Sequence, residues 1–362
     1  MIKGYAGSAT GQSHLVQGKA NEDAFCVLPL PDRWIAAVAD GVGSCSHAEQ
    51  ASSIAVETSV TFVHENRPID NAPISIKSLI RTAYNRALLE IKKEADKAGE
   101  PLSEYDTTLS LVVYDGERGY FAHVGDGGII GLRRDGTYVE LSKCQRTQDG
   151  CVIPLRAGYA YWQIEEIREP LSAVFLATDG IMDKIRHPEL EQGLYVPLLL
   201  LLADPRIIEH LRAKGVHYNE FLKDPMNSLP LPKMFYQALF HAMRRYGFKH
   251  ATATNIVNSI KQNGLPHKML DAITDDKTCV CLYNPEAYPT AREVRYYLEP
   301  DWSAVAARQQ ALLYPGLKVE KDAPAPRADD QATPLPRRKR NRLRSRIHKL
   351  WKNVTERKKR NE

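Results

Sequence analysis

The chain has 362 residues, 43% hydrophobic and 26% charged, so it is long and apolar enough for one large folded domain or two ordinary ones. Its formal net charge of +5 is uneven: residues 337–362 hold 13 Lys or Arg against two Asp or Glu, and the rest is mildly acidic. This composition excludes a wholly disordered chain, and the longest apolar run, residues 195–203, is too short to span a bilayer. The N-terminal residues show no secretory signal, and we therefore expect a cytoplasmic protein.

Short runs rich in Val, Ile, Ala and Tyr recur along the chain and predict strands. The expected strands are residues 34–39, 109–114, 120–124, 128–133, 173–178 and 278–283. Two stretches, residues 47–66 and 74–98, carry apolar residues at helical spacing. Strands before, between and after long helices predict a mixed α+β sandwich.

Residues of about 185–270 differ from this pattern and predict a helical insertion between the last two strands. They hold the leucine-rich run and two amphipathic stretches, residues 233–246 and 251–262. We expect the insertion either to shape the choice of substrate or partner or to be a structural elaboration. Residues 286–320 form a C-terminal extension without a clear pattern. Residues 321–336, rich in Pro, Ala and Asp, predict a flexible linker.

The basic tail, residues 337–362, contains one apolar series at helical spacing: Leu343, Ile347, Leu350 and Val354. If residues 342–357 are helical, the tail forms a basic amphipathic helix. Such a helix could bind an anionic membrane surface, a nucleic acid or an acidic protein, and a solvated tail is the alternative. The sequence does not separate these possibilities.

Acidic residues lie beside several of the expected strands, often next to glycine. The segments are Asn21-Glu22-Asp23, Asp40-Gly41, Gly125-Asp126-Gly127, Thr178-Asp179-Gly180 and Asp275-Asp276. Hard divalent cations prefer oxygen ligands, and strand ends gathered at one edge of a sandwich could hold two of them. Because no His or Cys cluster accompanies the carboxylates, Mg²⁺ or Mn²⁺ fits better than zinc. Any single Asp-Gly pair is also typical of a plain turn, so the hypothesis depends on the joint pattern.

In this order, the motifs resemble the metal-dependent protein phosphatases of the 2C type, and their bacterial branch in particular. The matching segments are GQSHLVQGKANEDAF, AAVADGVGS, FAHVGDGGI, FLATDGIMD and TDDKT. The resemblance implies a sandwich of two antiparallel sheets flanked by helices within residues 1–285, with a dinuclear metal site at one end. It also implies hydrolysis of phosphoserine and phosphothreonine by a metal-activated water, without a phospho-enzyme. A phosphoprotein substrate and a cognate Ser/Thr kinase are then the expected partners.

The resemblance further implies a set of ligands within these motifs: Asp40 bridging both ions, Glu22 and the Gly41 carbonyl on one ion, and Asp179 with Asp275, or alternatively Asp276, on the other. Asp23 would orient ligands and bound water. Asp126 stands where the family often holds a third, weaker ion.

The chain departs from the family pattern at two positions. The usual phosphate-binding Arg, four residues before the metal-binding Glu, is replaced by Gly18. His14 and Lys19 are the remaining candidates for holding the phosphate, against a structural His and a surface Lys. The position where eukaryotic members often place a general-acid His is Val42, so a metal-bound water could protonate the leaving group instead.

Two other functions compete with an active phosphatase. One is a catalytically silent member of the family that binds a phosphoprotein or a regulator. The other is a membrane- or nucleic-acid-binding protein that acts through its basic tail. The silent member is disfavoured by four intact expected ligands, for which a dead site has no chemical need: Glu22, Asp40, Asp179 and Asp275.

Overall fold

The computed structural model describes residues 1–66, 72–215, 222, 231–263 and 273–313, with backbone alone at 231–235. The chain divides into two units, Met1–Val305 and Ala306–Glu362. The first unit therefore extends past the boundary at residue 285 that the motifs delimit. The expected linker, residues 321–336, and the basic tail lie outside the described residues.

Ten strands of the described part form two five-stranded sheets in which every pairing is antiparallel. The first sheet has the order β1–β10–β9–β6–β7, with bounds Lys3–Ala9, Lys277–Tyr283, Leu171–Ala177, Gly128–Arg133 and Tyr138–Glu140. The second has the order β2–β3–β4–β5–β8, with bounds Asp23–Pro29, Trp34–Asp40, Leu109–Tyr114, Gly119–Val124 and Gln163–Ile167.

The central strands are buried on both faces. In β3, Ile35 and Ala37 contact one apolar cluster, while Ala36 and Val38 belong to the cluster between the two sheets. Successive side chains of a strand point to opposite faces, so a strand covered on both sides reads as a continuous apolar run. This is why the sequence of β3 lacks polar alternation.

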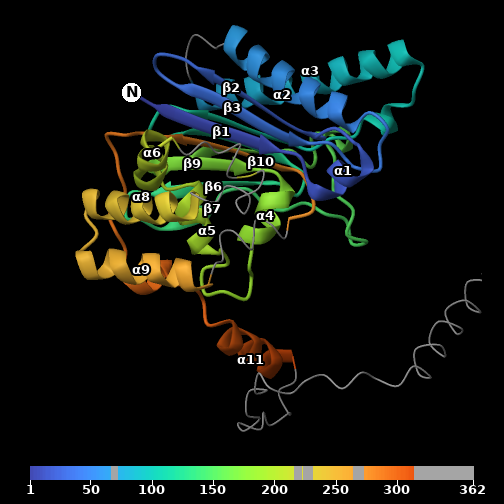
Figure 1. The fold of residues 1–362 in the computed structure, drawn as a ribbon. Helices are drawn as coiled ribbons and strands as arrows, with labels where there is room; N and C mark the ends of the chain where they lie inside the picture. Colours follow the sequence, from blue (N-terminus) through green and yellow to red (C-terminus); the bar gives the residue numbers. More distant parts are fainter. Residues whose placement is uncertain (67–71, 216–221, 223–230, 264–272, 314–362) are drawn as a thin grey trace, which may run out of the picture. The chain divides into compact units, whose positions relative to one another are not determined.

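Helices α2 (Ala48–Glu65) and α3 (Pro73–Ala98) cover the outer face of the second sheet (Figure 1). Proline at the first position starts α3, and Gly99, in the left-handed conformation at φ +75°, ends it. Buried residues such as Val56, Ile80 and Ile91 face the sheet. A short helix, α1 (Gln12–Gln17), lies between β1 and β2.

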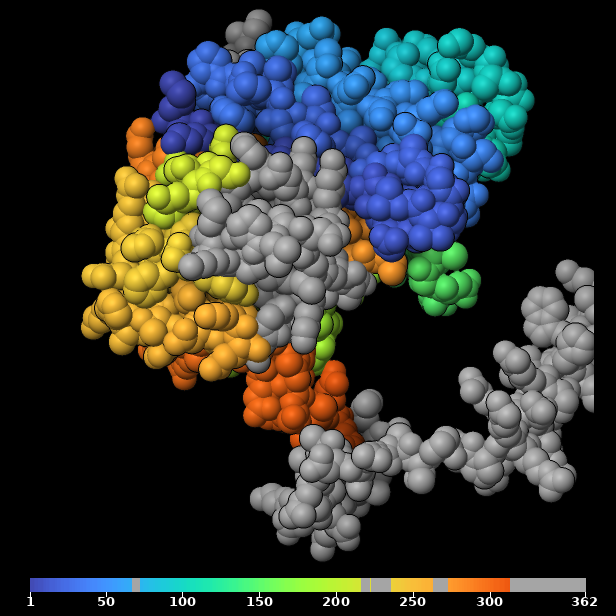
Figure 2. Space-filling view, in the orientation of Figure 1, coloured from blue at the N-terminus to red at the C-terminus, as the bar shows by residue number. Residues whose placement is uncertain are grey.

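The helical insertion supplies the layer on the outer face of the first sheet (Figure 1). After α4 (Asp179–Ile185), which precedes the insertion, its helices are α5 (Val196–Leu202), α6 (Pro205–Ala213), α8 (Leu231–Arg245) and α9 (His250–Asn263). Figure 2 shows α8 and α9 forming a continuous outer surface. Leu199, Ile207 and Ile256 share one core with Phe175 of β9. The insertion therefore completes the sandwich, which supports its structural role.

Part of the segment after β10, within residues 294–302, packs into the same core. Short 3₁₀ helices lie at Leu102–Tyr105, Leu155–Ala157 and Val294–Tyr297, and a last helix, α11, spans Trp302–Leu313. Tyr297 is fully buried against Phe248 of the insertion.

The α+β sandwich with helices on both sides, expected from the sequence, is thus confirmed. No helix of the described residues combines the length and apolarity needed to cross a membrane.

Candidate metal centre

Strand ends bring three of the expected carboxylates together. Asp40 ends β3, Asp126 lies in the turn between β5 and β6, and Asp179 opens α4 directly after β9. One carboxylate oxygen from each lies within 4.8 Å of the other two. Two threonine hydroxyls hold the Asp40 backbone. The Asp40 N–H donates to Thr108 Oγ1 at 2.9 Å, and Thr107 Oγ1 donates to the Asp40 carbonyl at 2.9 Å. A single cation could therefore contact all three carboxylates.

Close backbone contacts at two glycines bring the Asp275–Asp276 segment to the same edge. A Cβ on Gly180 would lie 2.1 Å from the Asp276 carbonyl oxygen, and a Cβ on Gly11 would lie 2.3 Å from the Asp275 carbonyl carbon. Both distances are far inside van der Waals contact, so any side chain would push the segments apart. Gly11 and Gly180 thus allow the segments to converge.

Burial and mutual repulsion raise the pKa values of the clustered carboxyls. Burial, with Asp276 nearby, raises the pKa of Asp23 to about 8. Burial, with Asp126 and Asp275 nearby, raises the pKa of Asp179 to about 7. Burial and then the charge of Asp23 raise the pKa of Asp40 well above its ordinary value. A divalent cation would favour the charged forms and reverse these shifts.

Asp23 links strands of both sheets. It lies opposite Asp40 in the register of β2 and β3. Its Oδ2 accepts a hydrogen bond of 2.8 Å from Thr178 Oγ1. Thr178 Oγ1 in turn accepts a hydrogen bond of 3.1 Å from the Thr278 backbone N–H. Asp23 therefore ties β2 to the β9 and β10 ends beside the carboxylate cluster.

Asp275 and Asp276 have different surroundings. Asp276 is 2% exposed, and both of its carboxylate oxygens accept protein hydrogen bonds. Its Oδ1 accepts from the Gly11 N–H at 2.6 Å; its Oδ2 accepts from the Glu22 N–H at 2.6 Å and lies 2.9 Å from His14 Nδ1. Asp275 is exposed, and its charge contributes to the raised pKa of Asp179. Asp276 is thus engaged by the protein, while Asp275 is exposed and close enough to Asp179 for its charge to act there.

Glu22 lies between His14 and Lys19. Lys19 Nζ donates to Glu22 Oε1 at 3.1 Å and to the Gly43 carbonyl at 3.4 Å. His14 Nε2 lies 3.7 Å from Glu22 Oε2. His14 is 9% exposed, whereas the Lys19 side chain is 40% exposed and lines an open cavity of 410 Å³. Of the two candidates for holding the phosphate, only Lys19 is open to solvent.

Gly41, whose carbonyl is an expected ligand, lies against two segments, one at Glu22 and one at Ala48. Its N–H donates to the Glu22 carbonyl at 3.0 Å. A Cβ here would lie 2.4 Å from the Ala48 carbonyl oxygen at the start of α2. The position therefore admits only glycine without a backbone shift.

Two arginines at the centre were not identified from the sequence. Arg186 donates to the carbonyls of Asp126 and Gly127, the latter at 2.6 Å, and so supports the turn that carries Asp126. Arg146 lies among the carboxylates, with Nη2 at 3.0 Å from Asp126 Oδ2. Neither arginine lies in an acidic motif, and only the folded chain brings them to the site.

The donor set fits hard divalent cations. Within the described residues, two buried carboxylate oxygens have no hydrogen-bond partner: Glu22 Oε2 and Asp126 Oδ1. A buried carboxylate oxygen without a donor is costly, and a cation is the usual partner of such an atom. Because the ligands are oxygens, Mg²⁺ or Mn²⁺ matches them better than a soft metal.

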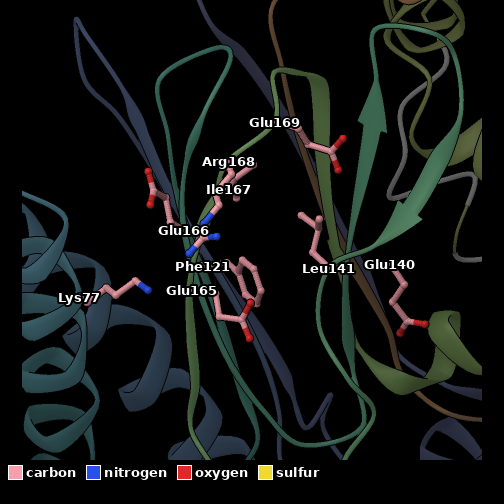
Figure 3. A pocket seen from close by; sticks show the side chains of 9 residues that line it. All are labelled: Lys77, Phe121, Glu140, Leu141, Glu165, Glu166, Ile167, Arg168 and Glu169. Carbon is pink, nitrogen blue, oxygen red and sulfur yellow. The ribbon is translucent and has the colours of Figure 1, made fainter.

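A second acidic cavity lies elsewhere, between the edge strands β7 and β8 (Figure 3). It has a volume of 530 Å³ and is lined by four glutamates, Glu140, Glu165, Glu166 and Glu169, together with Lys77 and Arg168 among others. The glutamate side chains point in different directions and do not converge on one point. The cavity therefore lacks the geometry of a metal site.

A family model described as protein phosphatase 2C matches residues 10–214, more than half of the chain. The chain therefore belongs to the protein phosphatase 2C family. The matched region includes Glu22, Asp40 and Asp179 and ends inside the helical insertion.

Similar solved structures are bacterial Ser/Thr phosphatases. Stp1 from Staphylococcus aureus is 13% identical, with 78% of this chain and 95% of that chain covered and a TM-score of 0.46. The S. agalactiae serine/threonine phosphatase is 14% identical, with 78% of this chain and 99% of that chain covered and a TM-score of 0.46. The catalytic domain of PstP, in complex with two manganese ions, is 17% identical, with 78% and 97% covered and a TM-score of 0.44. A search of curated proteins finds no match.

Proposed function

We propose that this chain is a metal-dependent Ser/Thr protein phosphatase that hydrolyses phosphoserine and phosphothreonine without a phospho-enzyme intermediate. The observation that carries the proposal is the convergence of Asp40, Asp126 and Asp179 in a member of this family. Burial and the neighbouring carboxylates raise the pKa values of Asp40 and Asp179, and such perturbed groups cluster at functional sites, which supports the proposal.

Two Mg²⁺ or Mn²⁺ ions are the proposed cofactors. Asp40 would bridge them; Glu22 and the Gly41 carbonyl would hold one, and Asp179 with Asp275 the other. Asp275 is preferred to Asp276 because the protein already engages both oxygens of Asp276. When bound, the ions would supply a water that is deprotonated near neutral pH and would neutralise charge on the phosphoryl group.

The chain's own residues have separate roles in this proposal. Asp276 orients His14 and the Glu22 backbone, and His14 in turn faces the free oxygen of Glu22. His14 is therefore proposed as a positioning residue. Lys19, exposed and at the edge of the centre, is proposed to attract the phosphoryl group once Glu22 is engaged by an ion.

The partners proposed with this function are a phosphoprotein substrate and a cognate Ser/Thr kinase, within bacterial signalling in the cytoplasm. A role of the basic tail on a membrane surface, nucleic acid or acidic protein remains a prediction from the sequence. The catalytically silent alternative is not favoured, because buried oxygens of Glu22 and Asp126 without protein partners have no use in a binding module.

Phosphate release from phosphopeptides tests the proposal. We expect the full chain with Mn²⁺ or Mg²⁺ to release phosphate from phosphoserine and phosphothreonine peptides, and a chelator to stop the release. Phosphotyrosine peptides of matched sequence serve as the control for substrate class. A folded chain that binds the ions but releases no phosphate from any peptide would contradict the proposal.

A further inference from the structure

The guanidinium group of Arg146 lies among three carboxylates at one side of the centre. Its Nη2 is 3.0 Å from Asp126 Oδ2, 3.5 Å from Asp183 Oδ2 and 3.6 Å from Asp179 Oδ2. Asp126 and Asp179 also belong to the convergent triad, whereas Asp183 lies one turn further along α4 and is half exposed. A fixed positive charge is therefore built into the acidic edge.

The backbone before Arg146 is tied to the turn that carries Asp126. The Gln145 N–H donates to the Gly125 carbonyl at 2.8 Å, and the Gly125 N–H donates to Gln145 Oε1 at 3.3 Å. Gln145 Nε2 also donates to the Tyr161 carbonyl at 2.8 Å. These bonds set residue 145 beside residue 125, and so the next residues, Arg146 and Asp126, adjoin.

The segment after Arg146 turns back at once. Arg146 and Val152 form an isolated antiparallel bridge, and the Thr147 N–H donates to the Cys151 carbonyl at 2.8 Å. Gly150, at φ +83°, provides the left-handed residue that this tight turn requires. The arginine thus projects from a closed hairpin rather than from an open loop.

The two carboxylate oxygens of Asp126 have different neighbours. Oδ2 faces Arg146, while Oδ1 is buried and, within the described residues, has no hydrogen-bond partner. One oxygen is thus left for an ion shared with Asp40 and Asp179, and the other is neutralised by the arginine. A further divalent ion between Asp126 and Asp183 would meet the guanidinium at contact distance, and two cations that close repel strongly.

We propose that Arg146 is a built-in cation that takes the place of a third divalent ion on the Asp126–Asp183 side of the centre. The chain then binds two ions, and Asp126 contributes to that pair instead of to a third site. This inference rests on the two-ion centre proposed above.

Counting Mn²⁺ by isothermal titration calorimetry on the full chain tests the inference. We expect two ions per wild-type chain and three in Arg146→Ala, because Asp126 and Asp183 then lose their arginine and can take an ion. Arg146→Lys should bind two ions, since it keeps a positive charge. Arg134→Ala removes a surface arginine paired with Glu117 and is the matched control, with two ions. In Arg146→Ala combined with Asp183→Asn, the third ion should be lost again.

The outcomes separate the inference from the proposed function. A wild-type chain that binds no Mn²⁺ would contradict the two-ion centre itself. Two ions in both wild type and Arg146→Ala, or three in both, would overturn the role of Arg146 and leave the centre standing. Thermal unfolding gives a second readout: Arg146→Ala should melt lower than wild type in chelator and gain more on Mn²⁺ addition. If Arg146→Ala does not fold, Arg146→Gln carries the same predictions.

Discussion

Asp23 and Asp40 face each other across the β2–β3 pairing, with no residue between them in the register. Two carboxyls in this position repel when both are charged, and burial adds to the cost. Burial is the largest cause that raises the pKa of Asp23 to about 8. Burial is also the largest cause of the raised pKa of Asp40, and the charge of Asp23 is the second. The pair therefore makes the metal-free chain less stable at the place where an ion would bind.

Asp23→Asn should stabilise the metal-free chain at pH 8.5. The amide keeps the shape and can still accept from Thr178, but it carries no charge. We expect a gain of about 1 kcal/mol or more, since one pKa unit corresponds to about 1.4 kcal/mol. Urea unfolding in chelator measures it, with Asp115→Asn in a surface turn as the control. A loss of stability in Asp23→Asn alone would show that Asp23 is not strained by its neighbours.

The stability of the metal-free chain should fall as the pH rises from 6.5 to 8.5. The folded-state pKa values of Asp23 and Asp179 lie near 8 and 7, above the ordinary value of 3.8. Between pH 3.8 and the raised folded-state pKa values, the folded state holds more protons than the unfolded state. The free energy of unfolding therefore decreases as the pH rises. Urea titrations in chelator at several pH values measure the slope. Added Mn²⁺ should weaken or reverse it, because metal binding requires deprotonated ligands. A flat profile in chelator would contradict the shifts.

Below pH 6.5 a second group acts against these two carboxyls. Burial, with the Arg186 charge nearby, lowers the pKa of His123 to about 4. His123 stays neutral between the Ser110 hydroxyl and the Gly125 carbonyl, whereas an unfolded chain would protonate it below about pH 6.5. Between pH 6.5 and 4, His123 therefore offsets part of the stability that the raised pKa values of Asp23 and Asp179 add, and His123→Gln should make the metal-free chain gain more stability as the pH drops.

His14→Ala should weaken metal binding rather than substrate binding. His14 contacts Asp276 and faces Glu22, so its loss frees Glu22 to move. Residues that orient metal ligands typically cost about 10–100-fold in affinity when removed. Lys19→Ala should instead raise KM for a phosphate ester with little change in Mn²⁺ affinity. Calorimetry and steady-state kinetics on both variants separate the two roles. Equal effects of the two variants on Mn²⁺ affinity would contradict the assignment.

Asp204→Ala should destabilise the whole first unit. Asp204 and Arg206 are fully buried in the insertion, and the Arg206 guanidinium donates to both carboxylate oxygens of Asp204. Removing one partner leaves a buried charge without its counter-ion, which costs about 3–5 kcal/mol. Chemical unfolding measures the loss, with Glu117→Ala at an exposed ion pair as the control. A loss confined to the insertion, with the sandwich still folded, would show that the helical layer is dispensable.

The sequence predicts best those strands that are buried on both faces. Residues 109–114 and 128–133 match β4 and β6 because their apolar runs are continuous. The sequence does not predict β1, β2, β7 or β8. In β1, KGYAGSA is built of small residues, and in β8, QIEEI forms a polar edge strand. Their place is set by pairing with β10 and β5, which no local pattern encodes.

The site could be predicted in part, because each acidic motif follows a recognisable strand. The convergence of Asp40, Asp126 and Asp179 agrees with that expectation. The different surroundings of Asp275 and Asp276 could not be predicted, since they depend on contacts with Gly11 and His14 more than 250 residues away. Arg146 could not be predicted either, because the bond between residues 145 and 125 sets its position.

The most direct test of the central claim is hydrolysis of p-nitrophenyl phosphate by wild type and by Asp40→Asn, with and without Mn²⁺ or Mg²⁺. Asp115→Asn is the matched control. The account predicts activity in wild type and Asp115→Asn that requires the metal and is abolished in a folded Asp40→Asn. Full activity in Asp40→Asn, or equal activity in chelator, would contradict a metal centre built on Asp40.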